Sequence, residues 1–233
     1  MINVNRISDI FFDLDHTLWD YETNSRATLL DLYSSFELHR FFSDECHFIQ
    51  TFKRQNQQLW HRYNMGEIDK YEIRNNRFGH IMNTVKNADL NLVKELSNQF
   101  IIECPKKKAL MPNARQVLDK LSKDFELGII TNGFDDTQNI KLKFSEIDHY
   151  FNWVVTSESS GHRKPAKGIF DFTLDCTGGS IEDMVIIGDN LRTDVLGAYN
   201  AGWKSVWYNP LKESSLRSQL QVFDLIELPA LFM

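Results

Sequence analysis

FFDLDHTLWD, at residues 11–20, places two carboxylates, Asp13 and Asp15, directly after an apolar run. The run from Ile7 to Leu14 is short and rich in isoleucine and phenylalanine, which predicts a buried strand. Two carboxylates this close repel each other, and each resists leaving water, so together they need a cation or a proton. We therefore expect a polar site at the point where this strand ends.

From about residue 106 onward, apolar runs alternate with helical patterns, which predicts a parallel sheet with helices on both faces. The first strand belongs with this half, because it is apolar and needs neighbours in a sheet. The sequence therefore predicts an α/β fold with a Rossmann-like core. Asn113 is expected to cap the first helix of this half. The expected strands are FELGIIT (125–131), WVVT (153–156), DMVIIGD (183–189) and, as the last, WKSVWYN (203–209); helices are expected at 113–123, up to Lys143, around 168–177 and at about 192–200.

The segment between the first strand and this half is helical in pattern. Its apolar residues recur at mixed three- and four-residue steps, which is typical of amphipathic helices. A connection this long is not a bare loop in a compact domain, so we expect an inserted subdomain. The expected domains are a core at 1–17 and 106–233 and a helical cap at 18–105, over the carboxyl ends of the strands, where open parallel sheets bind ligands.

Four polar groups follow four of the expected strands. They are Asp13-x-Asp15-x-Thr17, Thr131-Asn132-Gly133, Lys164-Pro165, and Gly188-Asp189 with Asp194. Asn-Gly and Gly-Asp pairs are common in turns, and a single lysine is usually solvated, so each group alone says little. Acids, a hydroxyl and a lysine at successive strand ends, in this order, are not expected from four independent turns. The set therefore predicts one site at one edge of the sheet.

This motif set resembles that of the haloacid dehalogenase superfamily, and the likeness extends to the inserted helical cap. The resemblance implies that Asp13 attacks phosphorus to form an aspartyl-phosphate and that Asp15 protonates the leaving oxygen and then activates water. It also implies a Mg²⁺ ion on Asp13, on the backbone carbonyl of Asp15 and on Asp189, with Asp194 behind them. Mn²⁺ suits the same oxygen ligands.

The phosphate needs hydrogen bonds and positive charge. Thr131, the backbone near Asn132, and Lys164 are expected to bind it. Dehalogenating members of the superfamily lack the second acid, so the presence of Asp15 disfavours that reaction. His16 stands where many members have glycine or asparagine, and we interpret it as permitted variation.

The segments TNGF, SESSGHRKPAKGIF and GDNLRTDVLGAYNAGW most resemble those of pyrimidine 5′-nucleotidases with a helical cap. Aromatic side chains stack on nucleobases, so Trp60, Tyr63 and Phe134 are candidate substrate contacts, although aromatics at helical spacing are more often core. Three alternatives stay open: a sugar-phosphate phosphatase, a phosphomutase, and a non-catalytic protein that binds a phosphate ligand.

The composition indicates which kinds of binding partner and which cellular compartment to expect. A net charge of −6 gives no basic footprint for nucleic acid, so we expect a small phosphate ester as substrate and no nucleic-acid polymer. The three cysteines are odd in number and widely spaced, which favours a reducing compartment. The sequence shows neither a signal peptide nor a transmembrane span, so we expect a cytoplasmic protein without a membrane partner. The oligomeric state stays open.

Overall fold

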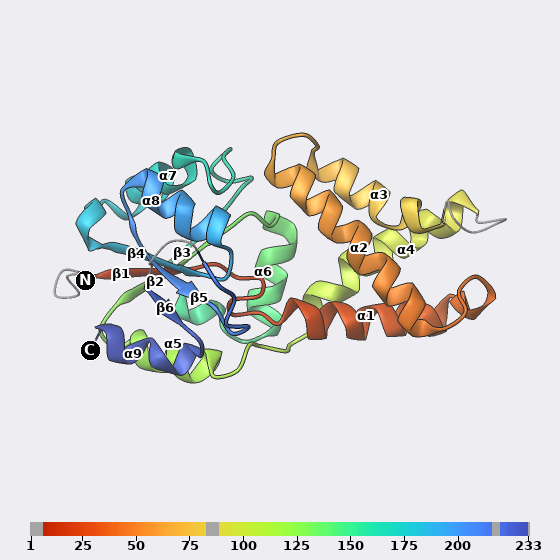
Figure 1. Ribbon diagram of the computed structural model, residues 1–233, viewed down its shortest axis with the longest axis horizontal. Helices are drawn as coiled ribbons and strands as arrows, with labels where there is room; N and C mark the ends of the chain where they lie inside the picture. The colour runs from red at the N-terminus through yellow and green to blue at the C-terminus, as the bar shows by residue number, and fades with distance from the viewer. Residues whose placement is uncertain (1–6, 83–88, 216–219, 233) are drawn as a thin grey trace. The chain divides into compact units, whose positions relative to one another are not determined.

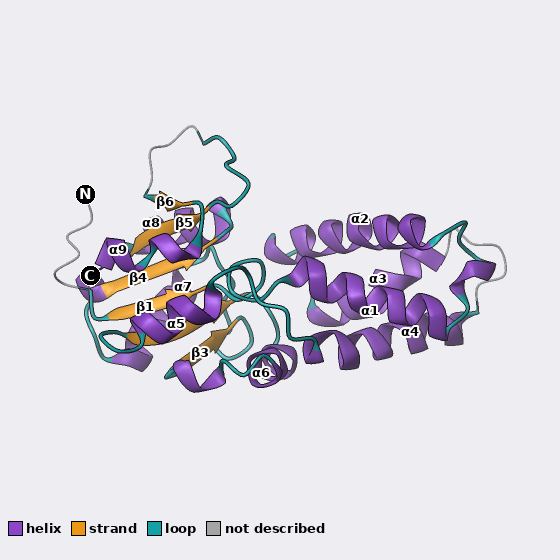
Figure 2. Ribbon diagram, turned by 90° about the horizontal axis from the view of Figure 1, so that it is seen from below, coloured by secondary structure: helices purple, strands orange, loops and turns teal. Residues whose placement is uncertain are grey.

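The computed structural model describes residues 7–82, 89–215 and 220–232. The chain divides into two compact units, one formed by 1–21 with 108–233 and the other by 22–107. The first unit contains the sheet, whereas the described part of the second is helical (Figures 1 and 2).

A six-stranded sheet with the order β3-β2-β1-β4-β5-β6 forms the centre of the first unit. Every pairing is parallel, and β1 lies between β2 and β4. This confirms the predicted α/β fold, in which the first strand pairs with strands far away in the sequence. The strands are β1 (Asp9–Phe12), β2 (Glu126–Thr131), β3 (Trp153–Thr156), β4 (Met184–Gly188), β5 (Lys204–Tyr208) and β6 (Gln221–Val222).

Helices cover both faces of this sheet, as Figure 1 shows. Phe11 of β1 packs in a buried cluster with Phe170, Ala198 and Trp203 on the face that carries α7 and α8. Side chains alternate along a strand, so Ile10 and Phe12 point to the other face, which carries α5 and α9. The helices of this unit are α5 (Ala114–Leu121), α6 (Asp135–Phe144), α7 (Lys167–Thr177), α8 (Gly197–Ala201) and α9 (Pro229–Phe232), with 3₁₀ turns at Asp148–Tyr150, Ile181–Asp183 and Leu225–Glu227.

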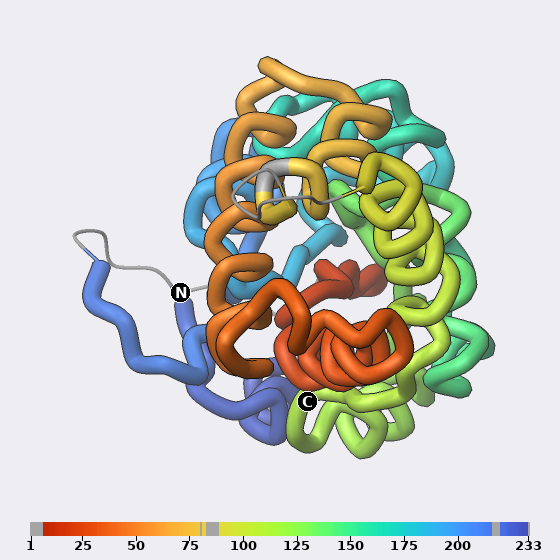
Figure 3. Tube along the Cα trace, turned by 90° about the vertical axis from the view of Figure 1, so that its right-hand side faces the viewer, coloured from red at the N-terminus to blue at the C-terminus, as the bar shows by residue number. Residues whose placement is uncertain are grey.

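The second unit contains α1 (Tyr21–Ser35, which begins one residue earlier), α2 (Glu45–Asn64), α3 (Lys70–Met82) and α4 (Leu90–Glu103), with 3₁₀ turns at Leu38–Arg40 and Cys104–Lys106. Figure 3 follows the chain through these helices, from red-orange to yellow-green. Buried phenylalanines hold three of them together, because Phe52 of α2, Phe78 of α3 and Phe100 of α4 contact one another. Aspartates at the N-caps begin two of the helices: Asp44 accepts from the His47 N–H and Asp89 from the Asn91 N–H.

Three details differ from the sequence-based expectations. The 203–209 strand is not the last, because the two-residue β6 pairs beyond it. Asn113 precedes α5 in a left-handed conformation (φ 62°) and makes no side-chain cap; its amide donates to Asp224 instead. The helix expected at about 192–200 begins with a π-helical segment, Leu191–Leu196, which continues into α8.

The chain leaves and re-enters the first unit through two paired segments. Trp19 and Leu110 form an antiparallel bridge. The Asp20 N–H donates to the Ala109 carbonyl, and the Met111 N–H to the carbonyl of residue 18. Among the described residues, no helix is both long enough and apolar enough to cross a membrane.

Candidate active site

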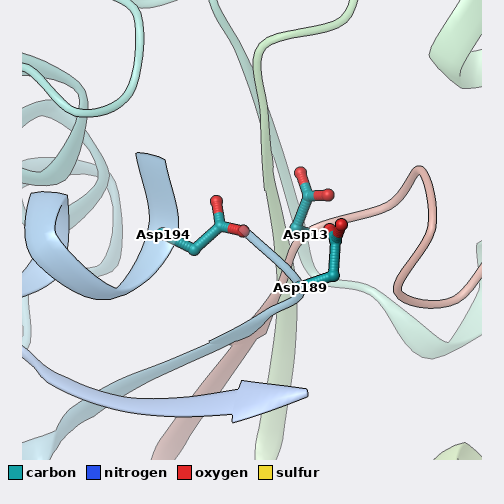
Figure 4. Close-up of side chains that lie close together, drawn as sticks. All are labelled: Asp13, Asp189 and Asp194. Carbon is teal, nitrogen blue, oxygen red and sulfur yellow. The ribbon is translucent and has the colours of Figure 1, made fainter. Parts of the chain in front are cut away.

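Three aspartates converge where β1 and β4 end. Asp13 follows β1 directly, and its N–H donates to the Ile187 carbonyl of β4. Asp189 follows β4, and Asp194 lies in the π-helical segment behind it. One oxygen of each carboxylate lies within 4.8 Å of the others. Figure 4 shows the three side chains close together. The predicted meeting of Asp13, Asp189 and Asp194 at one edge of the sheet is therefore present in the structure.

Gly188 permits this close approach. A Cβ at this position would lie 2.2 Å from a carboxylate oxygen of Asp194. The Asn190 N–H donates to the same carboxylate at 3.0 Å. The glycine after β4 thus admits the Asp194 side chain against the backbone of the strand end.

Lys164 is the cation at the centre of these acids, and it is 1% exposed. Its Nζ lies 2.7 Å from Asp13 Oδ1, 2.7 Å from Asp194 Oδ1 and 2.7 Å from the Ile130 carbonyl oxygen. An ammonium group has three N–H donors, and these contacts use all of them. In this structure Lys164 thus holds the two aspartates and the end of β2, and a phosphate would receive its charge through space.

Burial and charge shift the pKa values of this cluster. Burial raises the pKa of Asp13 from 3.8 to about 8; Lys164 opposes the shift, while Asp194 and Asp189 add to it. Burial and the Asp194 charge raise the pKa of Asp189 to about 7, against the opposing effect of Lys164. Burial alone would disfavour the charge of Lys164, but Asp13 and Asp194 raise its pKa. A single lysine therefore does not neutralise three acids.

Thr17 fixes Asp189 from the first strand end. The Asp189 N–H donates to Thr17 Oγ1 at 3.1 Å, and the Thr17 hydroxyl donates to Asp189 Oδ1 at 3.3 Å. Trp207 of β5 donates its indole N–H to the Asp189 carbonyl at 2.8 Å. These contacts orient the Asp189 carboxylate toward Asp13.

Asn132 ties the loop after β2 to the loop that carries Lys164. Its Nδ2 donates to the Lys164 carbonyl at 2.9 Å, and the Lys164 N–H donates to Asn132 Oδ1 at 2.7 Å. The side chain therefore holds the two loops together.

Thr131 is buried at the end of β2, and its oxygen already accepts twice. The Gly133 N–H donates to Oγ1 at 3.0 Å, and Gln138 Nε2 donates at 2.7 Å. A Cβ on Gly133 would lie 2.1 Å from Gln138 Nε2, so glycine admits the Gln138 side chain. With both acceptor positions of Oγ1 used, the Thr131 hydroxyl has its proton to offer to a phosphate oxygen.

Asp15 lies in a different environment from Asp13. Lys141 Nζ contacts both of its oxygens, at 2.6 and 2.8 Å, and Gln138 Nε2 donates to Oδ2 at 3.0 Å. Burial by itself would raise the pKa of Asp15, but Lys141 and Gln138 outweigh it and lower the pKa below its ordinary value. The Asp15 side chain is 24% exposed, so it remains accessible.

Sequence reasoning missed Gln138 and Lys141. Both lie on α6, three residues apart, and both are buried. The available signal was their position on one helix face with Phe134 and Ser145, which are also buried. Two long polar side chains on a buried face need partners, which here are Asp15 and Thr131.

The acidic cluster has the donor set of a site for a hard divalent cation. Its carboxylate oxygens are the ligands that Mg²⁺ prefers. The raised pKa values of Asp13 and Asp189 show that further positive charge would stabilise their ionised forms. The arrangement therefore fits Mg²⁺ on Asp13 and Asp189, beside the Lys164–Asp194 pair.

Two of the three candidate aromatic contacts are buried. Tyr63 and Phe134 are each 3% exposed, and Trp60 is half-buried. Trp60 and Tyr63 pack edge to face within the second unit, with ring centroids 5.5 Å apart. Of the three, Trp60 has the most surface to offer a ligand.

A prediction follows from the raised pKa values in metal-free protein. The folded protein holds protons on Asp13 and Asp189 up to about pH 7–8, whereas the unfolded chain releases them near the ordinary value of 3.8. The stability that these groups contribute is thus present at low pH and lost as the pH rises through the folded pKa values. Denaturant unfolding in EDTA should therefore show lower stability from this cluster at about pH 8 than at about pH 5.

Mg²⁺ should reverse this trend, because a bound cation competes with the protons. We expect the rise in melting temperature on adding Mg²⁺ to be larger at about pH 8 than at about pH 5. Asp189→Asn should lose most of this rise, while Asp119→Asn, on α5, should keep it. A rise of equal size at both pH values, unchanged in Asp189→Asn, would contradict this metal site.

Comparison with known proteins places this site in a family context. Residues 10–208 match the haloacid dehalogenase-like hydrolase family. The pyrimidine 5′-nucleotidase YjjG of Escherichia coli is 30% identical, over 86% of this chain and 85% of its own. The human N-acylneuraminate-9-phosphatase is 28% identical, over 99% of this chain and 95% of its own. The crystal structure of the Bacillus subtilis HAD-hydrolase YfnB bound to magnesium has a TM-score of 0.85 and 25% identity, and the match covers 97% of this chain and 99% of that one.

Proposed function

The chain belongs to the haloacid dehalogenase-like hydrolase family, and from this premise we propose that it is a Mg²⁺-dependent phosphomonoesterase that acts on small phosphate esters. The observation that carries the proposal is the separation of two neighbouring carboxylates into different environments. Asp13 lies among acids around Lys164, and Asp15 pairs with Lys141. In the metal-free protein the pKa of Asp13 is raised and that of Asp15 is lowered, so a cation beside Asp13 and the negative charge of a phosphate beside Asp15 are needed to ionise the first and protonate the second.

In the first proposed step, an oxygen of Asp13 attacks phosphorus and the bond from phosphorus to the leaving oxygen breaks. Asp15 gives a proton to that oxygen, so the product leaves as a neutral alcohol. In the second step, water attacks the aspartyl-phosphate and gives its proton to Asp15. The bond between phosphorus and Asp13 then breaks, which releases phosphate and restores the Asp13 carboxylate and the protonated carboxyl group of Asp15.

The other groups of the site position the reacting groups and neutralise the charge of the phosphate. Lys164 holds Asp13 through a 2.7 Å contact, and the Thr131 hydroxyl donates to a phosphoryl oxygen. A Mg²⁺ ion held by Asp13, the Asp15 carbonyl and Asp189 would keep Asp13 ionised and offset charge on the transferring oxygens. Asp194 would act through Lys164, which it contacts at 2.7 Å.

For the substrate, we propose pyrimidine nucleoside 5′-monophosphates. The support is the likeness to pyrimidine 5′-nucleotidases of Escherichia coli and of Streptococcus pneumoniae, the latter at 28% identity over 86% of this chain. In this proposal residues 1–17 and 106–233 are the catalytic core, and 18–105 are a cap that selects the leaving group through residues such as Trp60. The likeness to the human N-acylneuraminate-9-phosphatase supports a second candidate, an acylated sugar phosphate.

Phosphate release in Mg²⁺ from a panel of esters tests this proposal. The panel contains UMP, dUMP, dTMP, CMP, AMP, GMP, glucose 1-phosphate, glucose 6-phosphate and an acyl-sugar phosphate. We expect kcat/KM for the pyrimidine nucleotides to exceed that for the sugar phosphates by about tenfold or more, which corresponds to one good stacking contact, and to exceed that for AMP and GMP as well. Preference for a sugar phosphate would change the proposed substrate and leave the proposed reaction mechanism unchanged. Isomerisation without phosphate release would identify a mutase. Binding without turnover of any ester would refute the proposal that the protein is an enzyme.

A further inference from the structure

Two buried side chains of α6 contact Asp15, although neither lies at a strand end. Lys141 Nζ lies 2.6 Å from Asp15 Oδ1 and 2.8 Å from Oδ2. Gln138 Nε2 lies 3.0 Å from Oδ2 and 2.7 Å from Thr131 Oγ1. Gln138 therefore bridges the Asp15 carboxylate and Thr131 at the end of β2. Lys141 contacts both oxygens of the same carboxylate.

These contacts leave one acceptor position of the carboxylate open. A carboxylate accepts at about four positions, two on each oxygen. Lys141 and Gln138 occupy both positions on Oδ2, and Lys141 occupies one on Oδ1. The remaining acceptor position lies on Oδ1. Its direction is fixed by the contacts that Lys141 and Gln138 make with the carboxylate.

Lys141 also fixes the loop that carries Asp15. Its Nζ lies 4.6 Å from the centroid of the fully buried Trp19 ring, at the distance of a cation–π contact. Asp15 and Trp19 pair in a β-bridge, and the His16 N–H donates to the Trp19 carbonyl at 2.9 Å. Lys141 thus contacts both ends of the tight loop between Asp15 and Trp19.

We propose that Lys141, assisted by Gln138, is a positioning residue that aims the free position of Asp15 Oδ1 at the oxygen to which Asp15 gives its proton. This inference rests on the proposed phosphomonoesterase function, in which Asp15 is the proton donor. Proton transfer requires donor and acceptor oxygens within hydrogen-bond reach, so geometry decides whether a carboxyl group is effective. Without the contacts from α6, the Asp15 side chain would sample other rotamers, most of them unproductive.

The chemistry of the leaving group distinguishes positioning from a merely structural role. An alkyl phosphate must expel a strongly basic alkoxide, which needs the proton from Asp15. 4-Nitrophenyl phosphate expels a weakly basic phenoxide, which leaves without it. Because kcat/KM covers only the steps up to the first irreversible one, it reports formation of the aspartyl-phosphate and not its hydrolysis.

The experiment compares wild-type protein with Lys141→Met in Mg²⁺, using glycerol phosphate and 4-nitrophenyl phosphate. Methionine keeps an unbranched stem against Trp19 and removes the ammonium group. For glycerol phosphate we expect kcat/KM to fall about 100-fold, the size of a general-acid contribution. For 4-nitrophenyl phosphate we expect kcat/KM to change by less than about threefold, while kcat and KM fall together because Asp15 also activates the water of the second step.

Equal losses of kcat/KM for the two esters would overturn the proposal, because they would show a general distortion of the site. Unchanged values for both would overturn it as well. Wild-type protein that hydrolyses neither ester nor any member of the panel would refute the proposed function itself. Lys143→Met is the matched control, since Lys143 lies on the same helix with an exposed side chain, and it should match wild type.

Gln138→Met provides a second test if Lys141→Met does not fold. It removes one contact to Asp15 Oδ2 and one to Thr131 Oγ1 and leaves the ion pair, so the ratio of the losses on the two esters is the readout. We expect a loss of kcat/KM for glycerol phosphate of about tenfold, with 4-nitrophenyl phosphate again within about threefold of wild type. Lys141→Arg keeps the cation and should recover part of the activity on glycerol phosphate. A Gln138→Met variant with equal losses on both esters would also contradict the proposal.

Discussion

Asp13→Asn is expected to lower phosphate release from every ester by about 10⁴-fold or more, because the amide lacks the nucleophilic oxygen that forms the aspartyl-phosphate. The loss should appear in kcat for alkyl and aryl phosphates alike, since nucleophilic attack is common to both. This pattern differs from that of Lys141→Met, whose effect on kcat/KM depends on the leaving group. Steady-state assays of phosphate release in Mg²⁺ measure the loss of kcat in Asp13→Asn.

The loss in Asp13→Asn should not come from unfolding. Asparagine has the shape of aspartate, and the change removes one of three carboxylates around Lys164. Burial and the neighbouring acids already make the ionised form of Asp13 costly in metal-free protein. The melting temperature in EDTA should therefore equal that of wild type or exceed it. Activity within about tenfold of wild type would rule out Asp13 as the nucleophile.

Lys164→Met should produce the largest loss of stability among single changes at the site. The lysine is buried and uses its three donors on Asp13, Asp194 and the Ile130 carbonyl. Its removal leaves buried carboxylates without their cation, which typically costs about 3–5 kcal/mol. Denaturant unfolding in EDTA measures the effect, and Mg²⁺ should recover part of the loss because it supplies charge to the same acids.

A matched control and a double variant make this test specific. Lys167→Met removes a lysine from an exposed pair with Asp171, which should change the free energy of unfolding by less than about 1 kcal/mol. Adding Asp194→Asn to Lys164→Met removes one unpaired acid, so the double variant should be more stable than Lys164→Met alone. A Lys164→Met loss no larger than that of Lys167→Met would contradict the view that Lys164 stabilises this buried cluster.

The acids at the strand ends could be predicted from the sequence, because the pattern that places each of them lies within its own segment of the chain. Asp13 follows an apolar run, and Asp189 and Asp194 follow another, so the pattern of each segment places its acids at one edge of a parallel sheet. Parallel pairing then brings the edge residues together without further information. Asn132 was predicted at the right place, but its clamp on the backbone of Lys164 depends on two loops whose shapes the sequence does not give.

The contacts of α6 with Asp15 were not predictable in the same way. Gln138 and Lys141 meet an acid more than a hundred residues earlier in the chain, and their pairing depends on how α6 packs. Asn113 shows the same limit, because a cap signal in the sequence gave way to a tertiary contact with Asp224. The strand β6 has only two residues, too few for a periodic pattern.

His16 has a structural explanation that was not available from the residue type alone. Its φ angle is 66°, in the left-handed region, which is uncommon for residues other than glycine and which asparagine, aspartate and histidine adopt more often than other residues. The conformation closes the loop between Asp15 and Trp19, in which the His16 N–H donates to the Trp19 carbonyl. The glycine or asparagine that many superfamily members have at this position would adopt it with less strain.

Acid quenching of the protein shortly after mixing with a ³²P-labelled phosphate ester and Mg²⁺ tests the central claim most directly. Asp15→Asn should slow hydrolysis of the intermediate, so an aryl ester on this variant favours accumulation. The account predicts hydroxylamine-labile label on the peptide that contains Asp13, in wild type and more strongly in Asp15→Asn, and none in Asp13→Asn. Release of phosphate while the protein stays unlabelled in both, or label on another residue, would contradict it.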